Sequence, residues 1–225
     1  MDEEAQAIAA RLVRRLKEYG AILTVAESCT GGLLASTFTD IAGASQWFTQ
    51  SWVTYSNESK TKELEVEADL LSKKGAVNAT VAIQMAEGAR KRSGADFSIS
   101  ITGIAGPRQD SSMKPIGLVY VGIATKHWAN AESIQMGGNR HENKRGFVQF
   151  ALRTAIDCWD KAKVRKKEAV EKEVLAQEEK ERAETLMQQE KDRINAEATQ
   201  SAPWQDDSWK ADGADSKLDV DWSEE

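Results

Sequence analysis

The sequence predicts an α/β layered domain with a mixed sheet, followed by a long charged helix and an acidic tail. Apolar runs rich in β-branched residues alternate with segments of helical periodicity up to about residue 163. Two of these runs, 116–125 and 131–136, are close neighbours in the chain and favour an antiparallel hairpin within the sheet. Beyond residue 163 charged residues dominate.

The N-terminal segment 2–19 is predicted to be a helix that ends at Gly20, because its apolar residues share one stripe: Ile8, Leu12, Val13 and Leu16. The next expected elements are a buried strand at 21–26, a helix at 33–43, and a strand at 47–55. The last of these alternates and is rich in aromatic and β-branched residues.

The middle of the chain predicts one or two short helices within 58–74 and a longer helix at 77–94, capped by Asn78 and closed by Gly94. A strand at 96–103 then enters a glycine-containing loop at 103–115. After the two hairpin strands, a helix is expected from Asn139 to about Lys163, with four residues facing inward: Phe147, Phe150, Ala151 and Ile156.

Three regions are therefore expected: a domain at 1–163, a charged helix at 164–198 and a disordered tail at 199–225. Residues 161–198 hold ten basic and ten acidic residues without a sustained heptad, so a single exposed helix and a weak coiled coil both stay open. The tail carries a net charge of −6 and three of the seven tryptophans. Those tryptophans indicate either a motif that docks on a protein partner or chance composition.

Composition excludes several classes of protein. The two cysteines lie far apart and provide no disulfide framework, and with only two histidines no zinc-ligand spacing exists, so no metal site is expected. No apolar run is long enough for a membrane helix, and the acidic N-terminus does not resemble a signal peptide, which predicts a cytoplasmic protein. Residues 1–198 carry no net charge, which argues against nucleic-acid binding.

The stretch TVAESCTGG, residues 24–32, is the first candidate for chemistry. A strand, a short loop and a helix start place backbone N–H groups where they could hold an anion. Ser28, Cys29 and Thr30 are possible nucleophiles, and Gly31 and Gly32 would let a ligand approach the backbone. A purely structural turn is the alternative.

Three further stretches carry polar groups. Tyr55 and Lys60 lie where a strand gives way to a helix, and a desolvated lysine can lose its proton and act as a base. SITGIAGP, residues 100–107, leads into a glycine turn, and Arg140 or Arg145 could meet an anion at a helix start. Dinucleotide-binding and short-chain dehydrogenase motifs are absent, so a nicotinamide-dependent redox role has little support.

In combination and in this order, AESCTGG, FTQSWVTYSNESK, GAVNATVAIQMAEGA, SISITGIAGP and KPIGLVYVGIAT resemble the CinA C-terminal domain family over about residues 5–162. The resemblance implies a three-layer α/β/α sandwich that usually forms a homodimer. It also implies an amidase of pyridine nucleotide salvage, which converts nicotinamide mononucleotide to nicotinate mononucleotide and ammonia without a metal or cofactor.

By this resemblance Ser28 matches the nucleophile, and Tyr55 and Lys60 match the residues that assist it. Thr102 and Gly103 match the wall formed by the glycine loop, and Arg140 matches the arginine after the last strand. In the expected mechanism Lys60 takes the proton of Ser28, with Tyr55 relaying or orienting, and backbone N–H groups of Cys29–Gly32 hold the oxyanion. Cys29 is the rival nucleophile, disfavoured because no histidine partner is placed beside it.

The chain departs from the family pattern in two respects. By the resemblance, it is expected to start directly at the amidase-like domain, without the nucleotide-pyrophosphatase-like domain of larger CinA proteins. It also continues into the charged helix and the tryptophan-bearing tail. The alternative function is therefore a non-catalytic nucleotide-binding or scaffold protein that works through its tail.

Overall fold

The computed structural model describes residues 2–107 and 114–200. Contacts between Cα atoms divide the chain into two units, Met1–Arg165 and Lys166–Glu225, which are described separately below. Most of the expected tail lies outside the described residues, so its disorder and its protein partner stay predictions, as does the expected boundary at residue 163.

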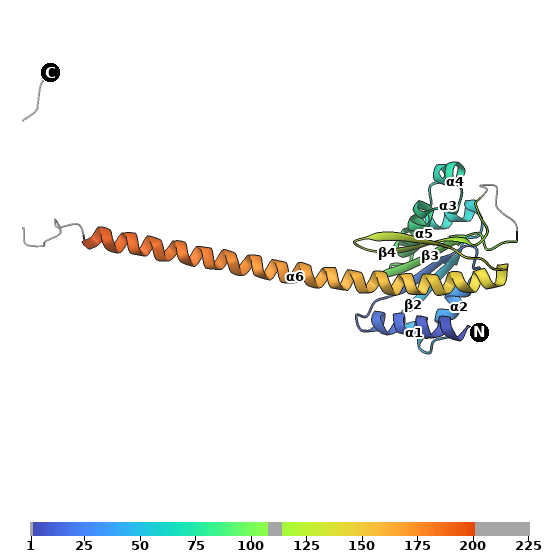
Figure 1. Ribbon diagram of the computed structural model, residues 1–225, viewed down its shortest axis with the longest axis horizontal. Helices are drawn as coiled ribbons and strands as arrows, with labels where there is room; N and C mark the ends of the chain where they lie inside the picture. Colours follow the sequence, from blue (N-terminus) through green and yellow to red (C-terminus); the bar gives the residue numbers. More distant parts are fainter. Residues whose placement is uncertain (1, 108–113, 201–225) are drawn as a thin grey trace, which may run out of the picture. The chain divides into compact units, whose positions relative to one another are not determined.

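A five-stranded mixed sheet forms the centre of the first unit, as predicted (Figure 1). Its spatial order is β2-β1-β3-β4-β5, with β1 parallel to both neighbours and the pairs β3–β4 and β4–β5 antiparallel. The strands are β1 (Leu23–Glu27), β2 (Phe48–Val53), β3 (Phe97–Gly103), β4 (Leu118–Thr125) and β5 (Ala129–Gln135).

Helices cover both faces of this sheet, which makes the domain a three-layer α/β/α sandwich (Figure 1). One face packs against α1 (Glu3–Lys17), α2 (Leu33–Thr39) and the first part of α6 (Arg140–Gln200). The other face packs against α3 (Asn57–Leu64), α4 (Ala68–Lys74) and α5 (Ala79–Ser93). Buried strand residues point alternately to these two layers, as the pleat of a sheet requires.

Helix α5 approaches the sheet closely because the sheet carries small residues beneath it. Ser98 and Ser100 on β3 donate hydrogen bonds from their hydroxyl groups to the carbonyls of Ala86 and Ala82 on α5. A Cβ atom at Gly122 of β4 would lie 2.2 Å from the carbonyl oxygen of Ala82, so only glycine fits there. This tight layer supports the strand β3, whose end reaches the candidate site.

Two elements are shorter than the sequence predicts. The helix expected at 33–43 ends at Thr39, and the following segment passes through Gly43 at φ +78° into a 3₁₀ turn at Ala44–Gln46. The strand expected at 47–55 ends at Val53, so Thr54 and Tyr55 leave the sheet. That early exit releases two main-chain carbonyls for the candidate site.

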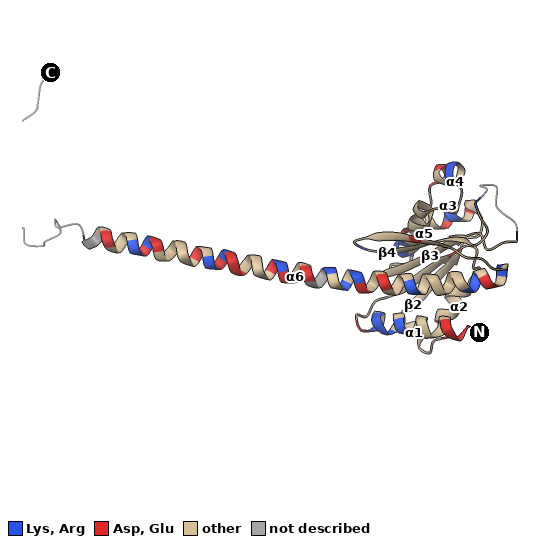
Figure 2. Cartoon of the chain, viewed as in Figure 1, with Lys and Arg blue, Asp and Glu red and all other residues tan. Residues whose placement is uncertain are grey.

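The helix expected at 139–163 is the beginning of α6, which continues without a break to Gln200 because no glycine or proline interrupts it after Gly146. Its residues 168–198 in the second unit are exposed and mix both signs of charge (Figure 2). Ion pairs at helical spacing, such as Lys180 with Glu184 and Arg193 with Glu197, support this part of the helix. The choice between a single helix and a coiled coil stays a prediction.

None of the helices in the described part of the chain has both the length and the apolar character needed to cross a membrane.

Candidate active site

The predicted site residues converge at the carboxyl ends of three adjacent parallel strands. The turn 28–32 follows β1, Tyr55 and Lys60 follow β2, and the loop 104–106 follows β3. A cavity of about 230 Å³ lies among them. Its lining includes Ser28, Cys29, Tyr55, Lys60, Thr102, Gly103 and Arg140. A cleft outside the carboxyl ends of parallel strands is the usual ligand site of an open α/β sheet.

Lys60 and Ser28 form the centre of this cavity. The Nζ atom of Lys60 lies 3.0 Å from the Oγ atom of Ser28, and the Lys60 side chain is almost completely buried. Helix α3 places the lysine there, because Ser56 and Ser59 form a reciprocal capping box that fixes where the helix begins. Lysine is rarely buried, and a buried lysine beside a hydroxyl group in a cavity is a candidate for a chemical role.

The surroundings of Lys60 favour its neutral form. Burial lowers the pKa of its ammonium group from 10.5 to about 8. Its Nζ atom also lies 2.8 Å from the carbonyl oxygen of Thr54 and 3.4 Å from that of Tyr55. In the neutral amine, two N–H groups can serve these carbonyls while the lone pair accepts the hydroxyl proton of Ser28. The arrangement can therefore activate the serine.

The thiol of Cys29, the rival nucleophile, stays protonated and therefore unreactive. Burial raises the pKa of its thiol to about 12, and the nearby Glu27 carboxylate adds to the effect. A thiol with this pKa carries almost no thiolate at neutral pH, and the thiolate is the reactive form. The geometry therefore favours Ser28 as the nucleophile.

Glu27, the last residue of β1, changes the expected role of the turn. Its buried carboxylate accepts hydrogen bonds from the N–H groups of Gly32, Leu34 and Ala35, at 3.0, 3.1 and 2.8 Å. The N–H group of Gly31 donates to the carbonyl of Ser28. The positive end of α2 is thus already occupied by a carboxylate.

Fewer backbone N–H groups are left for an oxyanion than the four expected from Cys29–Gly32. Because Ser28, Gly31 and Gly32 already donate elsewhere, Cys29 and Thr30 hold the remaining N–H groups of this turn. Of these two residues, Cys29 lines the cavity and Thr30 does not. The hydroxyl group of Thr30 is fully buried and has no hydrogen-bond partner among the described residues. Its side chain does not line the cavity.

The phenol of Tyr55 points to Arg140. The Arg140 guanidinium donates to the Tyr55 hydroxyl at 2.8 Å and to the carbonyl of Gly106 at 2.5 Å. The hydrogen bonds of the described residues do not join this phenol to Ser28 or Lys60. Tyr55 reaches the lysine through its main-chain carbonyl, a contact that supports orientation rather than proton relay.

The two candidate arginines differ clearly. Arg140 lines the cavity, whereas Arg145 pairs with Asp2 at the start of α1 at 3.1 Å. The two predicted wall residues, Thr102 and Gly103, pack against neighbouring main chain. The Thr102 hydroxyl donates to the carbonyl of Ala76, and a Cβ atom at Gly103 would lie 2.7 Å from the carbonyl oxygen of Leu118.

Sequence reasoning missed several residues that hold the site. Asn143 on α6 is buried and donates to the carbonyls of Ala105 and Gly138, at 3.0 and 2.8 Å, which ties the loop after β3 to the helix. Glu27 was missed as the cap of α2. A carboxylate at the end of a strand just before a helix start is a recognisable signal for such a cap, but Asn143 and the carbonyl of Thr54 leave none.

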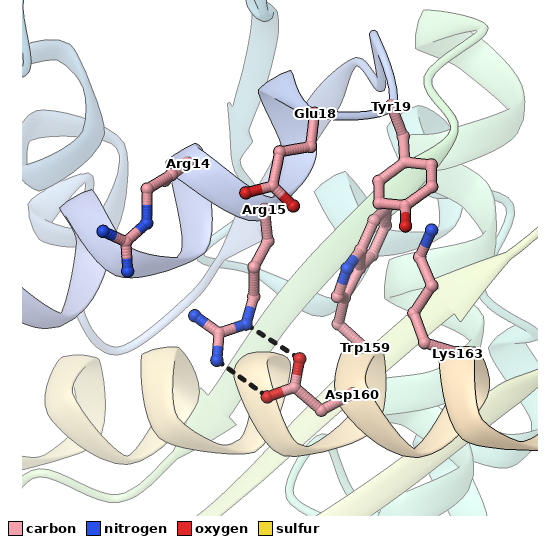
Figure 3. Close-up of a pocket in the computed structure, with 7 residues that line it drawn as sticks. All are labelled: Arg14, Arg15, Glu18, Tyr19, Trp159, Asp160 and Lys163. Atoms are coloured by element: carbon pink, nitrogen blue, oxygen red, sulfur yellow. Dashed lines mark hydrogen bonds and ion pairs between the residues drawn. The ribbon is translucent and has the colours of Figure 1, made fainter.

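A larger cavity, of about 510 Å³, lies between α1 and α6, away from these groups (Figure 3). Charged side chains that line it have partners within the cavity wall. Arg15 forms two hydrogen bonds of 2.8 Å with Asp160, and the Lys163 ammonium lies over the Tyr19 ring. These contacts hold the two helices together. In the described part of the chain, no group of three or more His, Cys, Asp or Glu residues could hold a metal ion.

Comparisons with known proteins place the chain among named relatives. The chain is 42% identical over 157 residues to the nicotinamide-nucleotide amidohydrolase PncC of Escherichia coli K12, an alignment that covers 68% of this chain and 93% of that protein. It is 43% identical over 141 residues to a CinA-like protein of Kosmotoga olearia, and there it spans about a third, 34%, of the relative's length.

Solved structures show the same fold. A CinA superfamily protein from Klebsiella pneumoniae superposes with a TM-score of 0.68 at 29% identity, covering 69% of this chain and 98% of that one. The competence/damage-inducible protein CihA of Agrobacterium tumefaciens gives 0.66 at 36% identity, covering 68% and 94%. The family model for the CinA C-terminal domain matches residues 5–159. The chain therefore belongs to the CinA C-terminal domain family.

Proposed function

We propose that this chain is a nicotinamide-nucleotide amidohydrolase that uses Ser28 as its nucleophile and Lys60 as its general base, without a metal ion. The reaction converts nicotinamide mononucleotide and water to nicotinate mononucleotide and ammonia. The observation that carries the proposal is the 3.0 Å contact between the Lys60 Nζ and Ser28 Oγ atoms, in a buried position that lowers the pKa of the lysine to about 8. The likeness to PncC supports the choice of substrate.

The first step is the attack of Ser28 on the carboxamide carbon. The Oγ–H proton passes to the neutral Nζ atom of Lys60 while the new C–O bond forms. The ammonium that results keeps the carbonyls of Thr54 and Tyr55 as partners, so the lysine stays in place as it charges. The cationic pyridinium ring of the substrate withdraws electrons from the carboxamide and makes it a better electrophile.

The second step expels ammonia. The N–H group of Cys29, which lines the cavity, is the proposed donor to the oxyanion, and an oxyanion-hole donor is typically worth roughly 10²–10³ in kcat. As the tetrahedral intermediate collapses, the C–N bond breaks and Lys60 returns its proton to the leaving nitrogen. A water molecule then attacks the ester carbon while Lys60 takes one of its protons. The C–Oγ bond breaks, Lys60 returns that proton to the Oγ atom of Ser28, and nicotinate mononucleotide leaves.

Tyr55 and Arg140 serve the site indirectly in this proposal. The carbonyl of Tyr55 orients the Lys60 amine, and its phenol holds Arg140 at the mouth of the cavity. Arg140 also grips the carbonyl of Gly106 and so fixes the loop wall that includes Gly103. These contacts shape the space that the pyridine ring would enter.

Ammonia release tests the proposal directly. The wild-type chain is incubated with nicotinamide mononucleotide in the presence of a strong chelator, beside the variants Ser28→Ala and Lys60→Met. Turnover that persists with chelator and disappears in both variants is the expected result. Release that Ser28→Ala does not reduce would reject the serine mechanism, and no release from the wild-type chain would favour the binding or scaffold alternative.

The family resemblance supports two further parts of the proposal, a homodimer and a role in pyridine nucleotide salvage. The proposed cytoplasmic location follows from the acidic N-terminus and the lack of an apolar run long enough for a membrane helix.

A further inference from the structure

The phosphate of the proposed substrate requires a cationic partner, and the turn after β1 does not supply one by itself. A helix N-terminus is an ordinary phosphate site. In this chain Glu27 already accepts hydrogen bonds from three N–H groups at the start of α2, so a phosphate placed there would face a buried carboxylate. The partner of the phosphate is therefore expected on the other side of the turn, where α6 begins.

Lys144 lies on that side. Its Nζ atom is 3.8 Å from the position that a Cβ atom on Gly31 would occupy, which places the ammonium directly beside the turn that carries Ser28. The side chain is partly buried. The adjacent Arg145 pairs with Asp2, and further along α6 Arg153 pairs with Glu4, whereas Lys144 has no ion pair or hydrogen bond within the described residues.

Arg140 extends the same cationic edge. Residues four apart on a helix share a face, so Lys144 and Arg140 lie one turn apart along the start of α6. Arg140 lines the cavity and uses two of its nitrogens for Tyr55 and Gly106, which leaves further N–H donors on the guanidinium. Lys144 itself does not line the cavity, so an anion would meet both cations where it extends past Arg140 toward Gly31.

We propose that Lys144 binds the 5′-phosphate of the nucleotide and so sets the preference of the site for nucleotides over nucleosides. The inference rests on the proposed function for its choice of substrate. In nicotinamide mononucleotide the carboxamide and the phosphate lie at opposite ends, separated by the ribose. The carboxamide at Ser28 and the phosphate at Lys144 place these two ends on the two sides of one turn, 28–32.

The test compares two substrates and three variants. Nicotinamide mononucleotide and nicotinamide riboside differ only in the phosphate, so the ratio of their kcat/KM values reports phosphate recognition. Lys144→Met should lower this ratio roughly tenfold to a hundredfold through KM, because a hydrogen bond to a charged group is lost. Lys144→Arg should keep most of the ratio. Lys91→Met removes an exposed lysine on α5 and should match the wild type.

The outcomes test the role of Lys144 independently of the proposed amidase activity. Equal losses on both substrates would show that Lys144 only supports the turn, and an unchanged ratio would show that it does not meet the phosphate; both results overturn the inference. If the wild-type chain releases no ammonia, calorimetric binding of the same two compounds replaces kinetics. A preference for the mononucleotide that Lys144→Met removes would uphold phosphate recognition even as the amidase proposal fails. The absence of that preference overturns it.

Discussion

The Nζ atom of Lys60 lies 3.0 Å from the Oγ atom of Ser28, although 32 residues separate the two in the chain. Parallel pairing of β1 with β2 brings them together. Glu27 is paired with Val53 at the ends of these strands, and the N–H group of Thr54 donates to the Glu27 carbonyl. The register of the two main chains thus sets the distance between the proposed base and the proposed nucleophile.

The rate of amide hydrolysis should follow the protonation of Lys60. Only the neutral amine can take the Ser28 proton, and the pKa of Lys60 is lowered to about 8. We expect kcat/KM to rise about tenfold per pH unit below about pH 8 and to level off above it. Steady-state ammonia release measured from about pH 6 to about pH 10 checks this. A profile that is flat below pH 8 would contradict a lysine base.

The same pKa makes a prediction about stability. The pKa of the lysine is 10.5 in the unfolded chain and about 8 in the folded one, so between these pH values the unfolded chain binds more protons. The free energy of unfolding, measured relative to Lys60→Met, should therefore rise with pH across this window, by about 3 kcal/mol in total. Urea unfolding of both proteins at several pH values checks this. A difference that does not change with pH would show that Lys60 is not desolvated.

Ser28→Ala and Cys29→Ala should separate the two possible nucleophiles. Removing the serine hydroxyl should reduce kcat by roughly 10⁴-fold or more, as loss of the nucleophile does in known serine hydrolases. Removing the thiol, whose pKa is about 12, should change kcat by less than about tenfold, because this thiol is not ionised. Single-turnover kinetics with nicotinamide mononucleotide distinguish the two. A severe defect in Cys29→Ala with a normal unfolding transition would reverse the assignment.

The layered fold, the mixed sheet and the hairpin of β4 and β5 could be predicted from the sequence, because apolar periodicity and β-branched runs report burial directly. The ends of elements could not. Whether residues 54 and 55 continue β2 depends on the pairing with β1, which stops at Glu27, and their own composition still favours a strand.

The sequence predicted the side chains that meet at the candidate site, but not the main-chain groups that hold them. Motifs singled out Ser28 and Lys60, which the structure brings into contact. The carbonyl of Thr54, which holds the lysine, has no sequence signature, since every residue has a carbonyl. The direction of the Tyr55 phenol was also out of reach, because it depends on Arg140, 85 residues later in the chain.

Tyr55→Phe tests whether the phenol relays a proton. The structure joins the phenol to Arg140 and leaves the contact with Lys60 to the main-chain carbonyl, which the substitution keeps. We therefore expect kcat to fall by less than about tenfold, against the roughly 10²–10⁴-fold loss that removal of a general base causes. Parallel assays of Tyr55→Phe and Lys60→Met provide the comparison. A phenylalanine variant as impaired as Lys60→Met would establish the relay.

Glu27→Gln should reduce both stability and kcat, because Glu27 holds the turn that carries Ser28. The carboxylate accepts from three N–H groups, whereas an amide replaces one accepting oxygen with an NH₂ donor that faces other donors. We expect a loss of about 1–3 kcal/mol in unfolding free energy.

Asp2→Ala is the matched control, since Asp2 caps α1 far along the chain from Ser28. It should cost about 0.5–2 kcal/mol and leave kcat close to that of the wild type. Thermal unfolding and ammonia release, measured on both variants, separate the two roles: a Glu27→Gln protein that is destabilised but fully active would show that the cap serves stability alone.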